Sequence, residues 1–217
     1  MIRFIYRGVR KIYYLLNYSI GYALTVIRLK GNGVRYGKNL KSYGSPRIDV
    51  WNGGKLSIGN NVSFNNGNRY NVIGRQQPCY FVVRSGAELT IGDNTGMSAT
   101  AIVCTEKIYI GNFVKIGGNS VIYDTDFHSL DPQQRSVIGS DLRNTKNMPV
   151  IIGDHVFIGA HSTILKGVQI GNNSIIGSGS VVTKNIPSNE IWGGNPARFI
   201  KVVPAQNIQP AASKIIV

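Results

Sequence analysis

The sequence predicts an all-β solenoid, a chain coiled into a three-sided prism with six residues along each side. Near the end of the chain, aliphatic residues recur at a strict interval of six, and four of them are followed directly by glycine. These positions are Ile152, Ile158, Ile164, Ile170, Ile176 and Val182. A period of six fits neither an isolated amphipathic helix nor a hairpin strand, whereas it fits one hexapeptide per side of a triangular prism.

Each hexapeptide also has a second inward position and a corner. Four residues after each aliphatic residue, the side chain is again small or aliphatic, as a narrow interior requires. These positions are Val156, Ser162, Val168, Ser174, Ser180 and Ile186. Gly, Asn, Asp and Ser occupy the corners at 153–154, 171–173 and 177–179, where the chain needs tight turns or a positive φ. Because the core is a thin column, no single coil is expected to fold alone.

The repeat sets the domain boundaries. The same phase appears upstream, with a fainter start at Leu56. The upstream positions are Ile91, Met97, Val103, Ile110, Ile116 and Ile122. We therefore expect the solenoid domain to span residues 56–203, after a lead-in segment at 31–55. Residues 204–217 lose the repeat and carry little to bury, which predicts a flexible tail.

Residues 1–30 are expected to form a basic amphipathic helix. The net charge is +14, and residues 1–48 contain ten Arg or Lys and no acid. Ile2, Ile5, Val9, Ile12 and Leu16 fall on one helical stripe, and the basic residues fall on another. The uncharged run 12–27 would span about 24 Å as a helix, short of a bilayer core of roughly 30 Å. Two roles stay open: the helix lies on a membrane surface, or it caps the prism.

Composition bears on two questions: the cellular compartment of the protein and whether it binds nucleic acid. Cys79 and Cys104 are the only cysteines, they lack metal-ligand spacing, and no secretory cleavage pattern follows the N-terminus. These features favour the cytoplasm. If the basic helix takes the membrane role and not the capping role, the expected location is the inner face of the cytoplasmic membrane. Nucleic-acid binding is not expected, because no recognised binding motif accompanies the positive charge.

A polar loop at residues 123–149 interrupts the repeat. Loops of this length in compact folds are usually functional or disordered. This loop contains His128 near Asp124, Asp126 and Asp131. Imidazole is well suited to accept a proton near neutral pH, provided that its other ring nitrogen has a fixed partner. Asp126, Asp131 or a backbone carbonyl could be that partner, and the sequence does not choose among them.

Residues 124–131 (DTDFHSLD) and 149–159 (PVIIGDHVFIG) resemble the galactoside, maltose and polysaccharide O-acetyltransferases of the hexapeptide-repeat acyltransferase superfamily. The resemblance runs from about Ile91 to Val203. It implies a left-handed parallel β-helix, acetyl-CoA as cosubstrate, no metal, and a homotrimer with active sites between prisms. It also implies that His128 is the catalytic base, which Asp126 and Asp131 would support.

The resemblance extends to residues that bind the two substrates. Cations suit the phosphates of coenzyme A (CoA), and backbone groups suit its pantetheine arm. The implied CoA contacts are Ala160, Ser178, Thr183, Lys184, Arg198 and Lys166. For the acceptor sugar, the resemblance implies Asn119 and Phe157. Glu106 is a further candidate for a sugar hydroxyl.

We therefore expect acetyl transfer from acetyl-CoA to a sugar hydroxyl in capsule or O-antigen synthesis. The main alternative is N-acetylation of an amino sugar, free or linked to a nucleotide. A metal enzyme like the γ-type carbonic anhydrase is less favoured, because His155 and His161 occupy the same slot of consecutive hexapeptides and so face different sides. A non-catalytic binding solenoid is also less favoured, because it would need no long polar loop.

Overall fold

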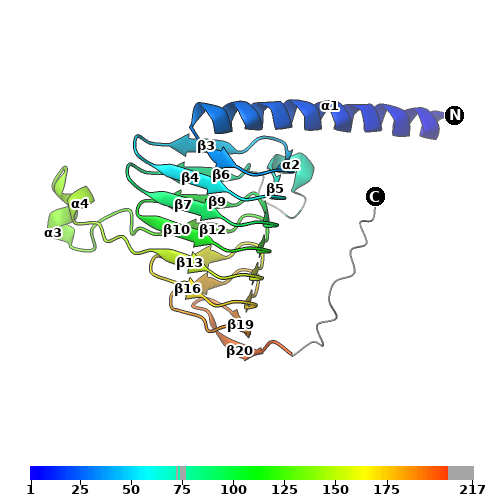
Figure 1. Cartoon of the computed structure of the whole chain (residues 1–217). Coiled ribbons are helices and arrows are strands. Elements are labelled where there is room, and N and C mark those ends of the chain that lie inside the picture. The colour runs from blue at the N-terminus through cyan, green and yellow to red at the C-terminus, as the bar shows by residue number, and fades with distance from the viewer. Residues whose placement is uncertain (72, 74–76, 205–217) are drawn as a thin grey trace.

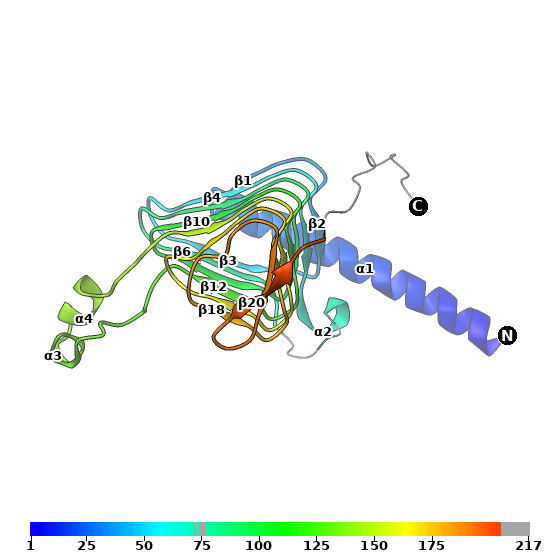
Figure 2. The same cartoon turned by 90° about the horizontal axis from the view of Figure 1, so that it is seen from below.

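The computed structural model describes residues 1–71, 73 and 77–204, and the expected tail beyond residue 204 lies outside the described residues. The described chain winds into a left-handed parallel β-helix with three flat sides, as Figures 1 and 2 show. Each coil adds one strand to each of three sheets, so the fold predicted from the repeat is confirmed.

The three sheets are parallel except at the C-terminal end. The first sheet contains β1 (Arg35–Tyr36), β4 (Lys55–Ile58), β7 (Glu88–Ile91), β10 (Lys107–Ile110), β13 (Val150–Ile152) and β16 (Gln169–Ile170). The second contains β2 (Lys41–Tyr43), β5 (Ser63–Asn65), β8 (Gly96–Ser98), β11 (Lys115–Ile116), β14 (Phe157–Ile158), β17 (Ile175–Ile176), β19 (Glu190–Gly193) and the antiparallel β20 (Arg198–Val202). The third contains β3 (Arg47–Val50), β6 (Tyr80–Val83), β9 (Ala101–Cys104), β12 (Val121–Tyr123), β15 (Thr163–Ile164) and β18 (Val181–Val182).

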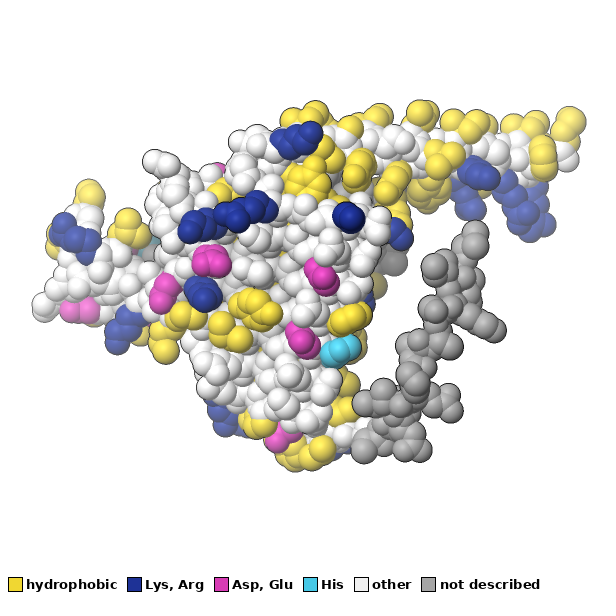
Figure 3. Space-filling model, in the orientation of Figure 1, with side chains coloured by type: hydrophobic (Ala, Val, Ile, Leu, Met, Phe, Trp, Pro, Cys, Tyr) yellow, Lys and Arg dark blue, Asp and Glu magenta, His cyan; other side chains and the backbone are white. Residues whose placement is uncertain are grey.

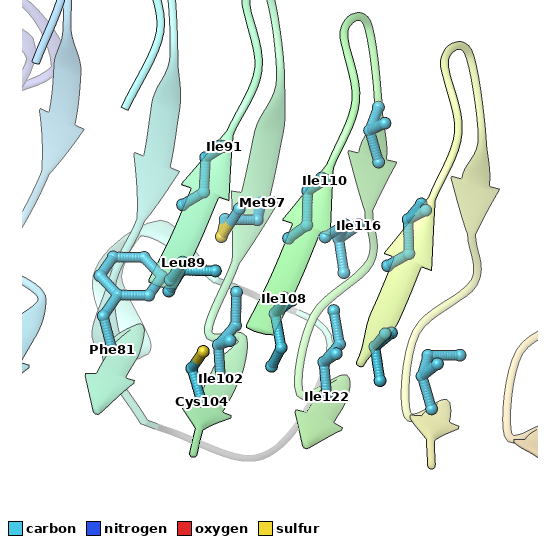
Figure 4. Packing of buried hydrophobic residues seen from close by; sticks show 14 of the residues in the cluster. Phe81, Leu89, Ile91, Met97, Ile102, Cys104, Ile108, Ile110, Ile116 and Ile122 are labelled. Carbon is cyan, nitrogen blue, oxygen red and sulfur yellow. The ribbon is translucent and has the colours of Figure 1, made fainter. Parts of the chain in front are cut away.

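The core is a column of stacked aliphatic side chains inside the prism. In the first sheet, Ile58, Ile91, Ile110, Ile152 and Ile170 pair in register from coil to coil, and each is at most 4% exposed. Figure 4 shows part of this stack. The second inward positions predicted from the repeat, 156 to 186 in steps of six, are buried as well. The interval of six therefore marks residues that leave water. Val103 is the exception, because Ile102 and Cys104 are the buried residues of β9 (Ala101–Cys104) and Val103 lies on its outer side.

The corners explain the recurrence of Gly followed by Asn or Asp. At the corner between the first and second sheets, the backbone N–H of Asn112 donates to Oδ1 of Asp154 at 2.7 Å. The N–H of Asp154 in turn donates to Oδ1 of Asn172 at 2.9 Å. A Cβ atom on Gly111 would lie 2.4 Å from that Asp154 oxygen, so no larger residue fits there. Polar side chains thus satisfy the corner backbone of the preceding coil.

The β-helix begins earlier than expected. Strands β1, β2 and β3 pair in parallel with β4, β5 and β6, so residues 35–50 form a first coil rather than a lead-in segment. The interval of six continues here at Tyr36, Ser42 and Ile48, although two of these residues are not aliphatic. The aliphatic repeat is weaker in this coil, because helix α1, and not another coil, packs against its open end. The repeat therefore did not predict it.

Helix α1 (Ile2–Gly31) lies across the N-terminal end of the prism (Figure 1). Gly21, Thr25 and Leu29 are buried against the first coil, and Thr25 Oγ1 is hydrogen-bonded to Ser42 Oγ at 2.9 Å. A Cβ atom on Gly21 would lie 2.8 Å from Cα of Gly44, which makes glycine necessary at this contact. The C-terminal half of α1 therefore caps the prism.

The N-terminal half of α1 projects beyond the prism (Figures 1 and 2). Figure 3 shows hydrophobic side chains along the outer side of the helix and basic side chains beneath its N-terminal half. Exposed aliphatic residues continue along the outer side over the capped half too, with Ile20 60% and Ile27 65% exposed. None of the described helices is long and apolar enough to cross a membrane.

Two insertions leave the prism. Helix α2 (Gly67–Tyr70) lies between β5 and β6, at the corner between the second and third sheets. The loop 123–149 leaves the corner between the third and first sheets and carries α3 (Pro132–Arg135) and α4 (Ser140–Arg143). Figure 1 shows α3 and α4 well away from the prism, on the side opposite the projecting end of α1.

Candidate active site

The loop 123–149 is fastened to the prism at what we call the loop corner, between the third and first sheets. The buried carboxylate of Asp124 accepts the backbone N–H groups of residues 105–107 at 2.7 to 2.8 Å. Segments 124–126 and 146–148 then pair as a short antiparallel ribbon. The loop therefore leaves the prism on a defined base.

A carboxylate from the far side of the loop holds His128. The imidazole Nδ1 lies 2.7 Å from Oδ2 of Asp141, and Oδ1 of Asp141 accepts the backbone N–H of Ser129 at 2.7 Å. These hydrogen bonds lower the pKa of Asp141, and the bond to His128 is the larger cause. An ionised Asp141 fixes one ring nitrogen, and the other belongs to a side chain that is 68% exposed. The pair can accept a proton from a group bound beside the loop.

Asp141 replaces the two acids expected to support His128. Asp126 instead forms an ion pair with Lys166 at 2.8 Å, and Asp131 caps α3 by accepting the N–H of Gln133 at 2.8 Å. The loop contains four acids, and the two near His128 in the sequence were predicted to be hydrogen-bonded to its imidazole. Because the loop folds back on itself, the more distant acid makes the contact.

The expected CoA residues fall on two columns that run along the prism. Lys166, Thr183 and Lys184 lie at the loop corner, on the coils that follow the loop. Lys184 lies over the ring of Trp192, 5.4 Å from its centroid. Ala160 and Ser178 lie at a different corner, between the second and third sheets, where the Ala160 carbonyl accepts the N–H of Gly179.

Arg198 and Lys166, two of the cations expected to bind CoA, differ in how exposed they are. Arg198 begins β20 and is exposed, and its guanidinium donates to the carbonyl of Ala197 at 3.2 Å. Lys166 is paired with Asp126 at the loop base and is only 22% exposed. In this structure Lys166 therefore braces the loop, and its contact with CoA stays a prediction.

The expected acceptor residues do not meet in one chain. Glu106 lies at the loop corner, Asn119 lies at the other end of β12, and Phe157 lies on the second sheet. Asn119 is 6% exposed, and neither polar atom of its side chain has a hydrogen-bond partner in the described part of the chain. A site containing both His128 and Phe157 would require residues from a second prism.

The histidines of the repeat lie at separate corners. His155 stacks on Phe113, with ring centroids 4.7 Å apart, at the corner between the first and second sheets. His161 lies at the corner between the second and third sheets. Over the residues that the structure describes, no group of three His, Cys, Asp or Glu side chains is placed to hold a metal ion.

Both cysteines belong to the core and not to the site. Cys79 and Cys104 are free and buried. Burial raises the pKa of the Cys79 thiol to about 12 and raises the pKa of the Cys104 thiol as well, where Asp124 adds to the effect. Neither thiol is therefore a nucleophile near neutral pH.

Comparison with known proteins places this geometry in a family. The family model "Hexapeptide repeat of succinyl-transferase" matches residues 149–184. A curated relative from Escherichia coli (strain K12), "Putative lipopolysaccharide biosynthesis O-acetyl transferase WbbJ", is 30% identical over 168 residues, which cover 77% of this chain and 71% of that protein. The chain belongs to the hexapeptide-repeat acyltransferases. The predicted family is thereby confirmed.

Two further proteins match, one over a shorter region and one at lower sequence identity. The galactoside O-acetyltransferase of Lactococcus lactis subsp. lactis (strain IL1403) is 37% identical over 55% of this chain and 56% of that protein. A mutant of AntD, an N-acyltransferase from Bacillus cereus solved with dTDP and coenzyme A, aligns over 82% of this chain and 88% of that chain, with 28% identity and a TM-score of 0.63. The chain spans only a little over half the length of several curated relatives that it matches.

Proposed function

We propose that the protein transfers an acetyl group from acetyl-CoA to a hydroxyl of a saccharide, in the synthesis of a surface polysaccharide such as capsule or O-antigen. One observation carries the proposal: an exposed imidazole, fixed at Nδ1 by Asp141, projects from a hexapeptide β-helix. The names of the relatives support the reaction class, since they include O-acetyltransferases and one lipopolysaccharide biosynthesis protein.

The chemistry follows from the fixed imidazole. With Nδ1–H donating to Asp141, Nε2 of His128 accepts the proton of the sugar hydroxyl as that oxygen attacks the thioester carbonyl. The tetrahedral intermediate collapses, the carbon–sulfur bond breaks, and the proton on Nε2 passes to the departing sulfur. The products are the sugar acetate and CoA. The Asp141 carboxylate stabilises the imidazolium that forms between the two steps.

The same proposal assigns CoA to the coils that follow the loop. Thr183, Lys184 and Arg198 supply a hydroxyl and two cations there, which suits the phosphates of CoA. Ala160 and Ser178 lie at another corner, and therefore a second prism is proposed to complete each groove. A homotrimer with three equivalent sites between prisms satisfies this requirement.

The test is acetyl-CoA consumption by the full chain with a panel of sugars, amino sugars and nucleotide sugars. We expect His128→Ala to lower kcat by about 10²- to 10⁴-fold while the KM for acetyl-CoA changes little. Near-normal transfer by His128→Ala would contradict the role of this residue. Failure of acetyl-CoA to raise the thermal midpoint of the protein would contradict the proposal as a whole.

Transfer to a sugar amine is the second candidate, because the AntD chain that aligns over 82% of this chain is an N-acyltransferase. The same His128 could accept a proton from an ammonium or an attacking amine. The two reactions give different products. Mild base releases acetate from an ester and leaves an amide intact, so treatment of the labelled product distinguishes them.

We further propose that the enzyme works on the cytoplasmic side of a membrane and contacts the lipid surface through α1. Capping uses one face of α1, whereas Ile5, Val9, Ile12 and Leu16 on the outer face are 56 to 60% exposed. A second copy is a poor partner for this face, because α1 carries six cations and no acid, so paired α1 helices would repel each other. Anionic lipid accepts both the apolar face and the charge.

Flotation with vesicles that contain anionic lipid tests this attachment. The full chain should float, and a variant lacking residues 1–17 should not, although it keeps Gly21, Thr25 and Leu29 in the cap. Val9→Asp should reduce flotation several-fold, whereas Asn17→Asp, which adds the same charge away from the stripe, should reduce it much less. Equal flotation of Val9→Asp and Asn17→Asp would contradict contact through the outer face.

A further inference from the structure

A cavity of about 370 Å³ lies at the loop corner, on the coils that precede the loop. Three successive coils provide its prism wall through Trp51, Arg84 and Thr105, and the loop provides Phe127 and Leu142. The remaining lining residues are Ser85, Val103, Thr125, Thr145 and Asn147. Its volume falls within the roughly 300–1,000 Å³ of typical ligand sites.

The cavity adjoins the catalytic pair. Phe127 immediately precedes His128, and Leu142 immediately follows Asp141, so two of the loop residues in the wall flank the hydrogen-bonded pair. The Cα atoms of adjacent residues are about 3.8 Å apart, so the backbone that carries the His128 imidazole lies beside the cavity wall. Along the same corner, the expected CoA residues Lys166 and Lys184 lie on the coils after the loop. The loop thus separates the CoA side from the cavity.

Arg84 gives the cavity its charge. Its guanidinium stacks on the ring of Trp51, with Cζ 4.0 Å from the centroid, and it forms no ion pair with any described residue. Among the described residues that line the cavity, it is the only charged side chain. Asp49, two residues before Trp51, accepts the indole N–H of Trp51 at 3.0 Å and forms no ion pair with Arg84. A stacked and unpaired guanidinium is well placed to hold a planar or tetrahedral oxyanion.

The neutral part of the wall suits a sugar ring. Trp51 is 44% exposed and Phe127 is 43% exposed, which provides aromatic surface for the C–H groups of a pyranose. The Thr105 hydroxyl and the Asn147 side-chain amide form no hydrogen bond with any described residue. Both groups can therefore pair with sugar hydroxyls.

We propose that this cavity binds the acceptor, and that the acceptor is an anionic saccharide whose charged group pairs with Arg84. This inference rests on the proposed function and deepens it, since it names the acceptor site and the charge of the substrate. The anionic group is either a ring carboxylate or a phosphate on the anomeric oxygen, because both present oxygens to a guanidinium in the same way.

The experiment measures binding without acetyl-CoA, so that it does not depend on catalysis. The full chain has two tryptophans, Trp51 and Trp192, and labelling with 15N-tryptophan gives one indole signal for each. Methyl glucuronide, glucose 1-phosphate and neutral methyl glucoside serve as probes. We expect at least one anionic probe to shift the Trp51 signal and leave Trp192 unchanged, with the neutral probe about tenfold weaker or worse.

Two variants sharpen the result. Arg84→Gln should remove the preference for the anionic probe, and in the transfer assay it should raise the acceptor KM by about tenfold while kcat and the KM for acetyl-CoA stay close to the parent values. Arg47→Gln is the matched control, because Arg47 also lies over an aromatic ring, that of Tyr80, but outside this cavity. It should behave as the parent protein.

The possible results distinguish failure of the acceptor-site proposal from failure of the proposed acetyl transfer. A Trp51 signal that responds to no probe, an equal response to charged and neutral probes, or an unchanged Arg84→Gln protein would overturn the anionic acceptor site. A Trp51 response without acetyl transfer to any sugar would leave the site standing and contradict the proposed function. Of the two anionic probes, the one that binds identifies the carboxylate or the phosphate as the recognised group.

Discussion

At the scale of single residues, the site depends on how one imidazole is held. The polar loop and the resemblance to the O-acetyltransferases pointed to His128, whose imidazole can exchange a proton near neutral pH. The choice of its partner depended on the path of the loop, which brings Asp141 to 2.7 Å from Nδ1. The same carboxylate binds the Ser129 backbone, so the ring and the loop are positioned together.

Replacing Asp141 should therefore reduce turnover more than replacing the acids nearer to His128. Hydrogen bonds to charged groups contribute about 1.5 to 3 kcal/mol, and Asp141→Asn should lower kcat by roughly 10- to 100-fold with little change in the KM for acetyl-CoA. Asp131→Asn removes the charge but keeps an oxygen that can cap α3, and it should leave kcat near the parent value. Steady-state kinetics that rank the two variants in the opposite order would reinstate Asp131 as the partner.

The lowered pKa of Asp141 predicts a pH dependence. Because the folded-state pKa lies below the ordinary value, the contribution of this carboxylate to the order of the loop is present above the unfolded pKa. It is lost as the pH falls through the folded pKa. Carbon-13 titration of the Asp141 carboxyl should show this low value, and it should move back toward the ordinary range in His128→Ala. An unchanged titration in that variant would show that the bond to His128 does not cause the shift.

At the scale of elements, the position of the loop 123–149 depends on the Asp124 carboxylate, which we call the staple. Asp124 follows β12 and accepts three backbone N–H groups from the preceding coil, so it directs the chain outward just where the repeat stops. The sequence marks this point only as a loss of phase after Ile122. The acids of the loop thus have different tasks: one staples the base, one pairs with Lys166, one caps α3 and one holds His128.

Removing the staple should be costly. Asp124→Ala leaves three partly buried N–H groups at the loop base without their acceptor. Hydrogen bonds to charged groups contribute about 1.5 to 3 kcal/mol each, so a loss of roughly 3 kcal/mol or more is expected. Asp131→Ala, which loses one exposed helix cap, should cost only about 1 kcal/mol. Thermal midpoints at one protein concentration compare the two variants. Faster amide exchange at residues 105–107 should accompany Asp124→Ala, and similar midpoints for both variants would argue against a structural staple.

At the scale of the whole molecule, the prism keeps the candidate residues at separate corners. His128, Lys166 and Lys184 lie along the loop corner, whereas Asn119 and Ser178 lie along the next, with the third sheet between the two. One straight prism does not close on itself, and therefore a groove lined by both columns would need two copies. This geometry is the physical argument for the proposed homotrimer.

The trimer predicts complementation between inactive variants. A trimer of 23.7 kDa chains has a mass of about 71 kDa, which sedimentation can check. His128→Ala lacks the base, and Ser178→Trp fills the proposed pantetheine groove at an exposed corner. If one prism supplies the base and its neighbour supplies that groove, refolding the two variants together should restore activity that neither has alone. No recovery in verified mixed trimers would show that each site lies within one chain.

The sequence by itself determined the prism, its inward rows, its corners and the place where the loop leaves. These features follow from a period of six and from residue types that act locally: aliphatic side chains leave water, and Gly, Asn and Asp accept tight turns. Tertiary structure alone decided the partner of His128, the first coil beneath α1, the division of α1 into a capping face and an exposed face, and the cavity of Trp51 and Arg84. Each of these joins residues that are far apart in the chain, and only the stacking of coils and the folding back of the loop set the distances between them.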